Sequence, residues 1–369
     1  MPDAIIAGHI CLDIIPNLAS HADGAFNAIL QPGKLVDIGA AQVSTGGTVS
    51  NTGLALHRLG IDTRLLAKVG ADPLGRTVKQ MIADHAPALV DGISASAETS
   101  TSYSIIISPP GVDRCILHHP GSNDDFTAAD VRDEDIQNAR LFHFGYPPLM
   151  ARMFSDNGAE LAKLFRRVKT LGLTTSLDMA LPDPNSAAGR ANWKAILQAT
   201  LPQVDIFLPS LDEILYMLGK DSQTPLSPEL LHEVSDELLA LGAKIIVIKL
   251  GERGLYLRVG SAEVLQGLGK VRPTYFTAWS NYEAWQPCYQ VDVAGTTGSG
   301  DATIAGFLSA FLRDMSPAKT LQAALAVGAC SVEAADALSG IKPWGETLNR
   351  IRAGWKQKDE PAKFTRINQ

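Results

Sequence analysis

The sequence of 369 residues predicts an α/β fold with a small second β-sheet, and three observations support this prediction. First, the segments 3–10 and 63–70 are typical of buried strands and flank a helical pattern, which is the spacing of a βαβ unit. Second, strands and helices alternate again further on, with strands predicted at 141–145, 173–178, 204–208 and 244–250. Third, two β-rich segments, 99–108 and 114–119, flank a Pro-Pro-Gly turn and predict a hairpin outside this alternation.

The bulk composition favours a globular enzyme and argues against several other classes. Hydrophobic residues make up 46% of the chain, and the mean hydropathy is +0.05. No apolar run reaches the roughly 18 residues of a membrane span, and the N-terminus has no leader pattern. A net charge of −7 without a basic run argues against a nucleic-acid partner. The four cysteines are scattered without a CxxC pair, so we expect neither a zinc site nor a disulfide framework, but a cytoplasmic enzyme.

Polar residues and glycines follow the first strand and open the first helix. Asp13 lies just past a strand end, where open α/β sheets bind ligands, although an exposed loop acid explains it equally well. Gly46 and Gly47 open a helix, and without Cβ atoms they let a ligand approach their amides. Asn51 lies one turn into that helix and offers a donor and an acceptor to a polyhydroxyl substrate, or is simply a polar surface residue.

The hairpin at 99–119 and the segment 10–45, which includes a strand predicted over 34–44, together suggest a small separate sheet. His118 and His119 are adjacent and therefore point to opposite faces of a strand, so we expect a structural role rather than joint metal binding.

Three later strand ends carry polar residues. Asp178 ends the strand at 173–178. Ser210 and Glu213 have the spacing of a capping box, which accounts for both residues without any functional role. The strand at 244–250 runs into the sequence Lys249-x-Gly251-x-x-Gly254.

A glycine-rich loop with the sequence GTTGSGD occupies 295–301 and precedes an apolar helical face formed by Ile304, Phe307, Leu308 and Phe311. Such a loop presents free amides at the positive end of a helix, which is a site for an anion such as phosphate. It is neither a P-loop, because Asp301 stands where Lys is needed, nor a dinucleotide fingerprint, because Thr303 replaces the third glycine. An anion cradle that ends in a carboxylate suggests phosphoryl transfer with Asp301 as the base. A turn whose acid merely stabilises the helix is, on this loop alone, equally probable.

Taken together, these motifs resemble those of the pfkB family of ribokinase-like sugar kinases, over residues 3–353. The loop at 296–301 resembles the family's TTGAGD motif, and Gly46-Gly47 with Asn51 resembles its sugar-site motif. The resemblance implies a three-layer α/β/α sandwich with a small β-sheet lid. The implied parts are a core at 1–9, 46–98 and 122–355, a lid at 10–45 and 99–121, and a loose tail at 356–369.

The resemblance also implies a role for each candidate residue. Asp301 would be the catalytic base, with the amides of Gly298, Ser299 and Gly300 as the anion hole. The substrate-binding residues would be Asp13, Gly46, Gly47 and Asn51. The nucleotide-binding residues would be Lys249, Gly251, Gly254 and Thr296. Glu213 would hold Mg²⁺ through water.

Two departures from the family pattern affect the implied cofactors, ATP and Mg²⁺. Gly295 stands where the family usually has the Asp that helps bind a monovalent cation. Whether this chain binds such a cation is therefore left open, with Asp292 as the nearest substitute ligand. Ser210 stands where the family has Asn in its NxxE motif, while Glu213 is retained.

The resulting expectation is ATP-dependent phosphorylation of a hydroxyl on a sugar or sugar-like substrate, by a homodimer joined through the lid. One alternative is a non-catalytic sugar- or nucleotide-binding protein, although a retained Asp301 argues against it. Others are a nucleoside kinase or a phosphosugar kinase. The latter needs a cationic pocket, for which only Arg114 and Lys34 are candidates. Arg114 on the hairpin could reach the substrate, but a solvated charge is the simpler reading. A nicotinamide dehydrogenase fits least, because no complete GxGxxG follows a strand.

Overall fold

The computed structural model describes residues 2–18, 29, 31–109 and 115–359. Within this part of the chain a nine-stranded sheet has the order β13-β12-β11-β10-β9-β8-β1-β4-β5. Neighbouring strands from β5 to β11 are parallel, while β12 and β13 add an antiparallel edge. The strands are β1 (Ala4–Gly8), β4 (Thr63–Gly70), β5 (Ile93–Ser96), β8 (Leu141–Gly145), β9 (Thr174–Leu177), β10 (Ile206–Phe207), β11 (Ile245–Lys249), β12 (Leu255–Val259) and β13 (Glu283–Gln286).

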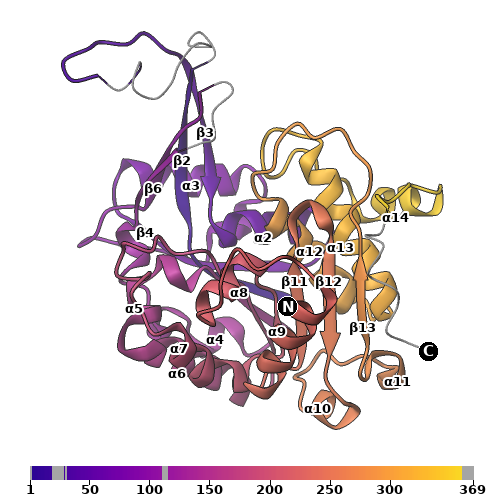
Figure 1. The fold of residues 1–369 in the computed structure, drawn as a ribbon. Helices are drawn as coiled ribbons and strands as arrows, with labels where there is room; N and C mark the ends of the chain where they lie inside the picture. Colours follow the sequence, from indigo (N-terminus) through magenta and orange to yellow (C-terminus); the bar gives the residue numbers. More distant parts are fainter. Residues whose placement is uncertain (1, 19–28, 30, 110–114, 360–369) are drawn as a thin grey trace.

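Helices cover both faces of this sheet, which makes the three-layer α/β/α sandwich seen in Figure 1. One apolar core packs the sheet against α2 (Thr48–Arg58), α3 (Pro73–Ala83), α10 (Ala262–Gln266), α11 (Phe276–Trp279), α12 (Ser299–Leu312), α13 (Pro317–Val332) and α14 (Trp344–Arg352). The other core contains α4 (Asp133–Ile136), α5 (Ala151–Phe154), α6 (Ala159–Thr170), α7 (Trp193–Thr200), α8 (Leu211–Met217) and α9 (Pro228–Ala240).

The residues of β1 show why the sheet is buried on both sides. Ala4 and Ile6 join one core, whereas Ile5 and Ala7 join the other, as the two-residue period of a strand requires. A strand enclosed by two helical layers needs apolar residues at every position, and such a continuous apolar run is what the sequence offers.

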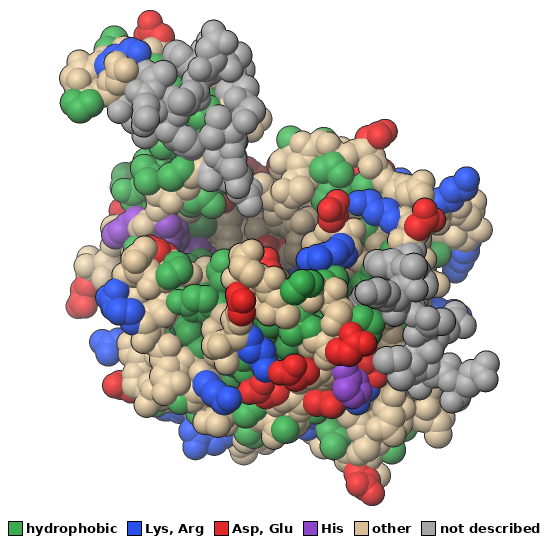
Figure 2. Space-filling view, viewed as in Figure 1, with side chains coloured by type: hydrophobic (Ala, Val, Ile, Leu, Met, Phe, Trp, Pro, Cys, Tyr) green, Lys and Arg blue, Asp and Glu red, His purple; other side chains and the backbone are tan. Residues whose placement is uncertain are grey.

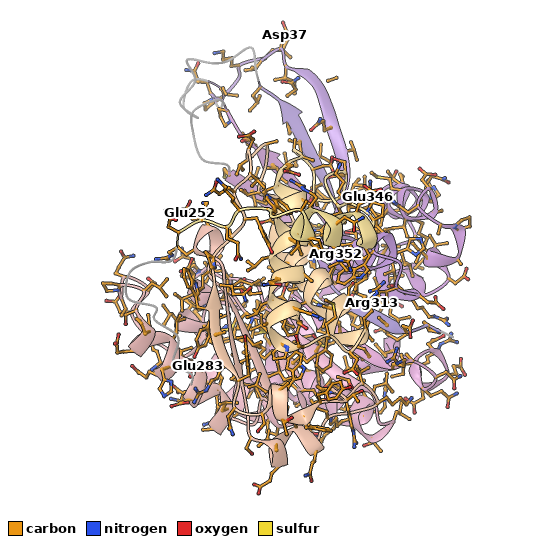
Figure 3. All side chains as sticks on the ribbon, turned by 90° about the vertical axis from the view of Figure 1, so that its right-hand side faces the viewer. Asp37, Glu252, Glu283, Arg313, Glu346 and Arg352 are labelled. Atoms are coloured by element: carbon orange, nitrogen blue, oxygen red, sulfur yellow. The ribbon has the colours of Figure 1, made fainter. Side chains whose placement is uncertain are left out.

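A separate four-stranded sheet with the order β3-β2-β6-β7 projects from the body (Figure 1). Its strands are β2 (Cys11–Asn17), β3 (Gly39–Gly46), β6 (Tyr103–Ile107) and β7 (Cys115–His119). β2 pairs antiparallel with β3 and parallel with β6, and β6 pairs antiparallel with β7. The turned view in Figure 3 shows this sheet standing clear of the body, with Asp37 near its far end. The strand predicted over 34–44 corresponds to β3, which begins later than expected, at Gly39.

Part of the C-terminal tail that we expected to be loose is ordered against the body of the protein. Residues 356–358 pair with 288–290 beside the main sheet, and 360–369 lie outside the described residues. Arg114 also lies outside the described part of the chain. No helix in that part combines the length and the apolarity needed to cross a membrane.

Candidate active site

Asp301 lies buried in the first turn of α12, where three side chains hold its carboxylate. The Asn51 amide and the Tyr146 hydroxyl donate to Oδ2, at 3.1 and 2.8 Å. The Thr52 hydroxyl donates to Oδ1 at 2.9 Å. The first turn of α2 thus lies against the first turn of α12, and the carboxylate is fixed between them.

The surroundings of Asp301 set its basicity. Burial raises the pKa of this carboxyl, while the hydrogen bonds from Tyr146, Asn51 and Thr52 and the charge of Lys249 lower it, and burial prevails. A carboxylate with a raised pKa accepts a proton more readily than an exposed one. The site therefore contains a group suited to remove a proton from a bound hydroxyl.

A glycine is required immediately before each of these two helices. Gly298 precedes α12 with a φ of 70°, and a Cβ there would overlap the Cβ of Ala337. Gly47 precedes α2 with a φ of 88°, and a Cβ there would lie 2.5 Å from the carbonyl oxygen of His9. At the start of α12 the Ser299 amide donates to the carbonyl of Thr296 at 3.3 Å, and at the start of α2 the Val49 amide donates to the carbonyl of His9 at 3.1 Å.

Lys249 pairs with a second buried carboxylate, Asp178, and its charge also acts on Asp301. Its ammonium lies 2.6 Å from Oδ1 of Asp178, at the carboxyl end of the sheet. Burial raises the pKa of Asp178 above its usual range against the opposing effect of Lys249. Burial alone lowers the pKa of Lys249, but Asp178, Glu213 and Asp301 together raise it. The cation is therefore retained and counters a locally acidic site.

Glu213 has the structural role that its spacing predicted. Its carboxylate accepts from the Ser210 amide at 2.6 Å, and the Ser210 hydroxyl accepts from the Glu213 amide at 3.3 Å. The capping box is therefore confirmed. It also brings Glu213 close enough to raise the pKa of Lys249, because Ser210 bridges Lys249 across the strand ends.

Among the predicted substrate-binding residues, Asn51 contacts Asp301, whereas Asp13 and Gly46 lie against each other. Asp13 on β2 lies against Gly46 at the end of β3, where any Cβ would overlap its carboxylate. The Cys11 thiol donates to Oδ1 of Asp13 at 3.3 Å. Asn51 leaves its own Oδ1 buried without a hydrogen-bond partner among the described atoms, while its amide nitrogen binds Asp301. A substrate hydroxyl bound here could donate a hydrogen bond to this unsatisfied Oδ1 while it lies next to Asp301.

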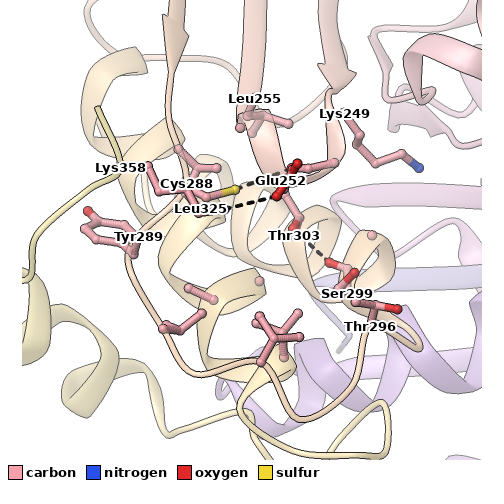
Figure 4. A pocket seen from close by; sticks show the side chains of 18 residues that line it. Lys249, Glu252, Leu255, Cys288, Tyr289, Thr296, Ser299, Thr303, Leu325 and Lys358 are labelled. Atoms are coloured by element: carbon pink, nitrogen blue, oxygen red, sulfur yellow. Dashed lines mark hydrogen bonds and ion pairs between the residues drawn. The ribbon is translucent and has the colours of Figure 1, made fainter. Parts of the chain in front are cut away.

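The predicted nucleotide-binding residues line one pocket of about 290 Å³ on the other side of the loop (Figure 4). Its polar end contains Lys249, Gly251, Thr296, Ser299 and Gly300, and Gly254 lies in the same wall. The remaining wall is mostly apolar and includes Leu255, Val291, Leu325, Ala329 and Val332. An apolar chamber that ends at the first turn of a helix and a lysine suits a base and its phosphates. Asp13 instead faces a second cavity of about 610 Å³, which reaches Thr297 and the loop after α13.

Tyr146 and Thr52 are site residues that sequence reasoning missed. Tyr146 follows β8 directly and adopts a left-handed conformation with a φ of 65°. Its place after a predicted strand was the available signal, because the carboxyl ends of parallel strands meet at one edge. Figure 2 shows a hollow between the projecting small sheet and the body, which is where this edge lies.

A profile of the pfkB family of carbohydrate kinases matches residues 1–343. The chain belongs to this family. The predicted family, the ribokinase-like fold and the class of activity, an ATP-dependent carbohydrate kinase, are thereby confirmed.

Several relatives of this pfkB-family kinase have names that fit this assignment. An uncharacterized sugar kinase of Archaeoglobus fulgidus is 26% identical over 264 residues, which cover 70% of this chain and 87% of the relative. The 2-dehydro-3-deoxygluconokinase of Bacillus subtilis is 24% identical over 322 residues, covering 84% and 87%.

Solved structures share the fold of this pfkB-family kinase at low identity. Arabidopsis thaliana ribokinase, solved with ribose and ATP, superimposes with a TM-score of 0.73 at 18% identity, covering 94% of this chain and 98% of that one. A putative ribokinase II of E. coli, solved with ATP and Mg²⁺, gives a TM-score of 0.69 at 20% identity, covering 96% and 100%.

Proposed function

We propose that Asp301 is the catalytic base of this kinase and removes the proton from a sugar hydroxyl as that hydroxyl attacks the γ-phosphorus of ATP. The observation that carries this proposal is the position of Asp301. It is a buried carboxylate with a raised pKa at the start of α12, between the substrate-side group and the apolar pocket.

In this mechanism, the new bond forms between the sugar oxygen and phosphorus, while the bond to the ADP oxygen breaks. The amides of Gly298, Ser299 and Gly300 bind the phosphoryl oxygens on which charge accumulates. The Lys249 ammonium lies beside Gly300, because a Cβ built on Gly300 would be 3.9 Å from Nζ of Lys249. Lys249 therefore adds positive charge next to the phosphoryl oxygens. Tyr146 and Asn51 keep the Asp301 carboxylate oriented throughout.

The residues around Lys249 fit a magnesium ion. Oδ2 of Asp178 is buried without a hydrogen-bond partner among the described atoms, and Glu213 adds a second carboxylate nearby. Carboxylate and water oxygens are the ligands that Mg²⁺ prefers, so Asp178 and Glu213 would hold it, Glu213 through water. When bound with ATP, the ion neutralises phosphate charge.

A monovalent cation at Gly295 fits this chain poorly. Gly295 has no carboxylate, and a Cβ at this position would lie 2.8 Å from the carbonyl oxygen of Ala335. Asp292, the nearest substitute, is exposed. The proposal therefore assigns no step to such a cation.

On the substrate side, Asp13, Gly46, Gly47 and Asn51 would bind sugar hydroxyls, and the small sheet would act as a lid that excludes water. Its outer strands β3 and β7 expose Val43, Ile116 and Leu117, which supports pairing of two chains lid to lid. We place the enzyme in the cytoplasm, a reducing compartment that contains ATP, and its four cysteines are free thiols.

The experiment compares purified wild type with Asp301→Asn, using ATP and a panel of sugars, sugar acids and nucleosides. Loss of a general base is expected to lower kcat by about 10²-fold or more. Asp91→Asn serves as the control, because it removes an exposed carboxylate that lines neither cavity and should retain full activity. An Asp301→Asn enzyme that turns over at nearly the wild-type rate would refute the assignment.

A further inference from the structure

The C-terminal end of the described chain forms part of the nucleotide pocket. Residues 355–358, which we call the C-terminal strap, lie along residues 287–290 in the pocket wall, and Lys358 lines the pocket itself. We propose that the C-terminal strap belongs to the nucleotide site and determines the affinity for the nucleotide, with Lys358 and Glu252 closing its rim. This inference rests on the proposed nucleotide site, and it assigns a function to residues 356–358, which the sequence suggested were loose.

Backbone hydrogen bonds fix the C-terminal strap to the wall. The Gln290 amide donates to the carbonyl of Lys356 at 2.9 Å, and the Lys358 amide donates to the carbonyl of Cys288 at 2.8 Å. Between them, Gln357 and Tyr289 form an antiparallel bridge. Because Cys288 and Tyr289 both line the pocket, the C-terminal strap extends its wall as an additional short strand.

Side chains anchor the C-terminal strap from behind. The Trp355 ring stacks on Tyr289 with centroids 4.6 Å apart, and its indole N–H donates to the carbonyl of Gln290 at 3.0 Å. The Arg350 guanidinium of α14 lies 3.6 Å from the centre of the Trp355 ring. Arg350 also binds Glu333 through two hydrogen bonds of 2.7 and 2.8 Å. The strap is therefore held in register by α14, and Tyr289 is supported from outside the pocket.

Lys358 and Glu252 meet across the rim of the pocket. Their charged atoms are 3.3 Å apart, and both residues line the cavity. Glu252 follows Gly251, whose φ is 59°, in the turn that connects β11 with β12. The ion pair is exposed, so it contributes little to folding. Its position instead ties the Gly251–Arg253 turn to the C-terminal strap on opposite sides of the opening.

The location predicts which kinetic constant responds. Figure 4 shows Lys358 and Tyr289 on one side of the pocket and Lys249, Ser299 and Thr296 on the other. If the phosphates bind at Lys249 and Gly300, the C-terminal strap contacts the opposite part of the nucleotide, away from Asp301. Its loss should weaken nucleotide binding, whereas kcat at saturating ATP and the KM for the sugar should not change.

The experiment measures ADP binding by calorimetry and the KM for ATP in full-length variants. Lys358→Ala removes the side chain beyond Cβ, including the ammonium, and is expected to lower the ADP affinity and raise the KM for ATP about 2- to 5-fold, in line with an exposed ion pair. Lys358→Pro also removes the N–H that bonds to Cys288, and its expected effect is about 10-fold or more. Lys319→Ala is the matched control, because this exposed lysine lies outside the C-terminal strap and does not line the pocket, so the variant should bind ADP like the wild type.

A charge exchange keeps the proposal testable if Lys358→Pro does not fold. Lys358→Glu should weaken ADP binding through repulsion from Glu252, and adding Glu252→Lys should restore it. Equal ADP affinity in wild type, Lys358→Ala and Lys358→Glu would overturn the inference, as would a fall in kcat with no change in affinity. These outcomes differ from failure of the proposed function, which would appear as a wild type that neither binds nor consumes ATP.

Discussion

Replacing Tyr146 with phenylalanine tests how the protein adjusts the basicity of Asp301. The Tyr146 hydroxyl donates to Oδ2 at 2.8 Å, and this bond is one of three that stabilise the ionised carboxylate against the effect of burial. Phenylalanine keeps the ring, with its packing against His9, and removes only the donor. The pKa of Asp301 should therefore rise further in the variant.

The size of the effect follows from the strength of one charge-assisted hydrogen bond. Such a bond contributes about 1.5–3 kcal/mol, which corresponds to a factor of about 10 to 100 in the ionised fraction. Because a general base must be ionised to act, kcat in the variant should fall by that factor on the acid side of the pH profile. The loss should disappear at high pH, where the carboxyl of both enzymes is ionised.

The assay is the pH dependence of kcat for wild type, Tyr146→Phe and Thr52→Val, at saturating ATP and sugar. Thr52→Val removes the donor to Oδ1 and should move the acid limb in the same direction. Tyr216→Phe is the control, since its hydroxyl donates to the carbonyl of Gly189 at 2.8 Å, and its profile should match the wild type. An acid limb of Tyr146→Phe that coincides with that of wild type would refute the reasoning. So would a loss of equal size at every pH.

Two further predictions concern the loop and the core. Gly298→Ala should lower kcat by about 10²-fold, because the new Cβ overlaps the side chain of Ala337 and displaces the amides of the anion hole. Gly219→Ala is the control, because Gly219 has the same φ of 70° but open space around it. This control should cost only about 1–2 kcal/mol of stability and leave kcat unchanged. Asp205→Asn should lower the free energy of unfolding by about 3–5 kcal/mol in urea titrations, because this fully buried carboxylate pairs with both Lys169 and Lys244. A variant as stable as wild type would show that these pairs do not contribute.

Local patterns in the sequence were sufficient for much of the fold. The alternation of strands and helices, the glycines before α2 and α12 and the capping box of Ser210 and Glu213 all depend on residues a few positions apart. Their conformations follow from periodicity, backbone freedom and short-range hydrogen bonds, so a single sequence specifies them. The residues that the family resemblance assigned to the nucleotide line one pocket, and their binding of a nucleotide stays a prediction.

The partners of Asp301 required the tertiary structure. Asn51, Thr52 and Tyr146 come from two distant parts of the chain, and nothing in their local sequence shows which carboxylate they bind. The pairing of Lys249 with Asp178 and the parallel register of β2 with β6 also join segments that are far apart in the sequence, so they too follow only from the tertiary structure.

The C-terminal strap shows why such long-range contacts could not be predicted from the sequence. Its charged, polar composition predicts a loose tail, because few apolar side chains are available to pack against a core. Its order instead depends on an unpaired backbone edge at 288–290 and on the ring of Tyr289, both of which exist only once the sheet has formed. By itself, the sequence determined which segments fold and which glycines open helices. The closure of long loops decided which side chains meet, because a contact between distant residues depends on the position of the whole chain between them.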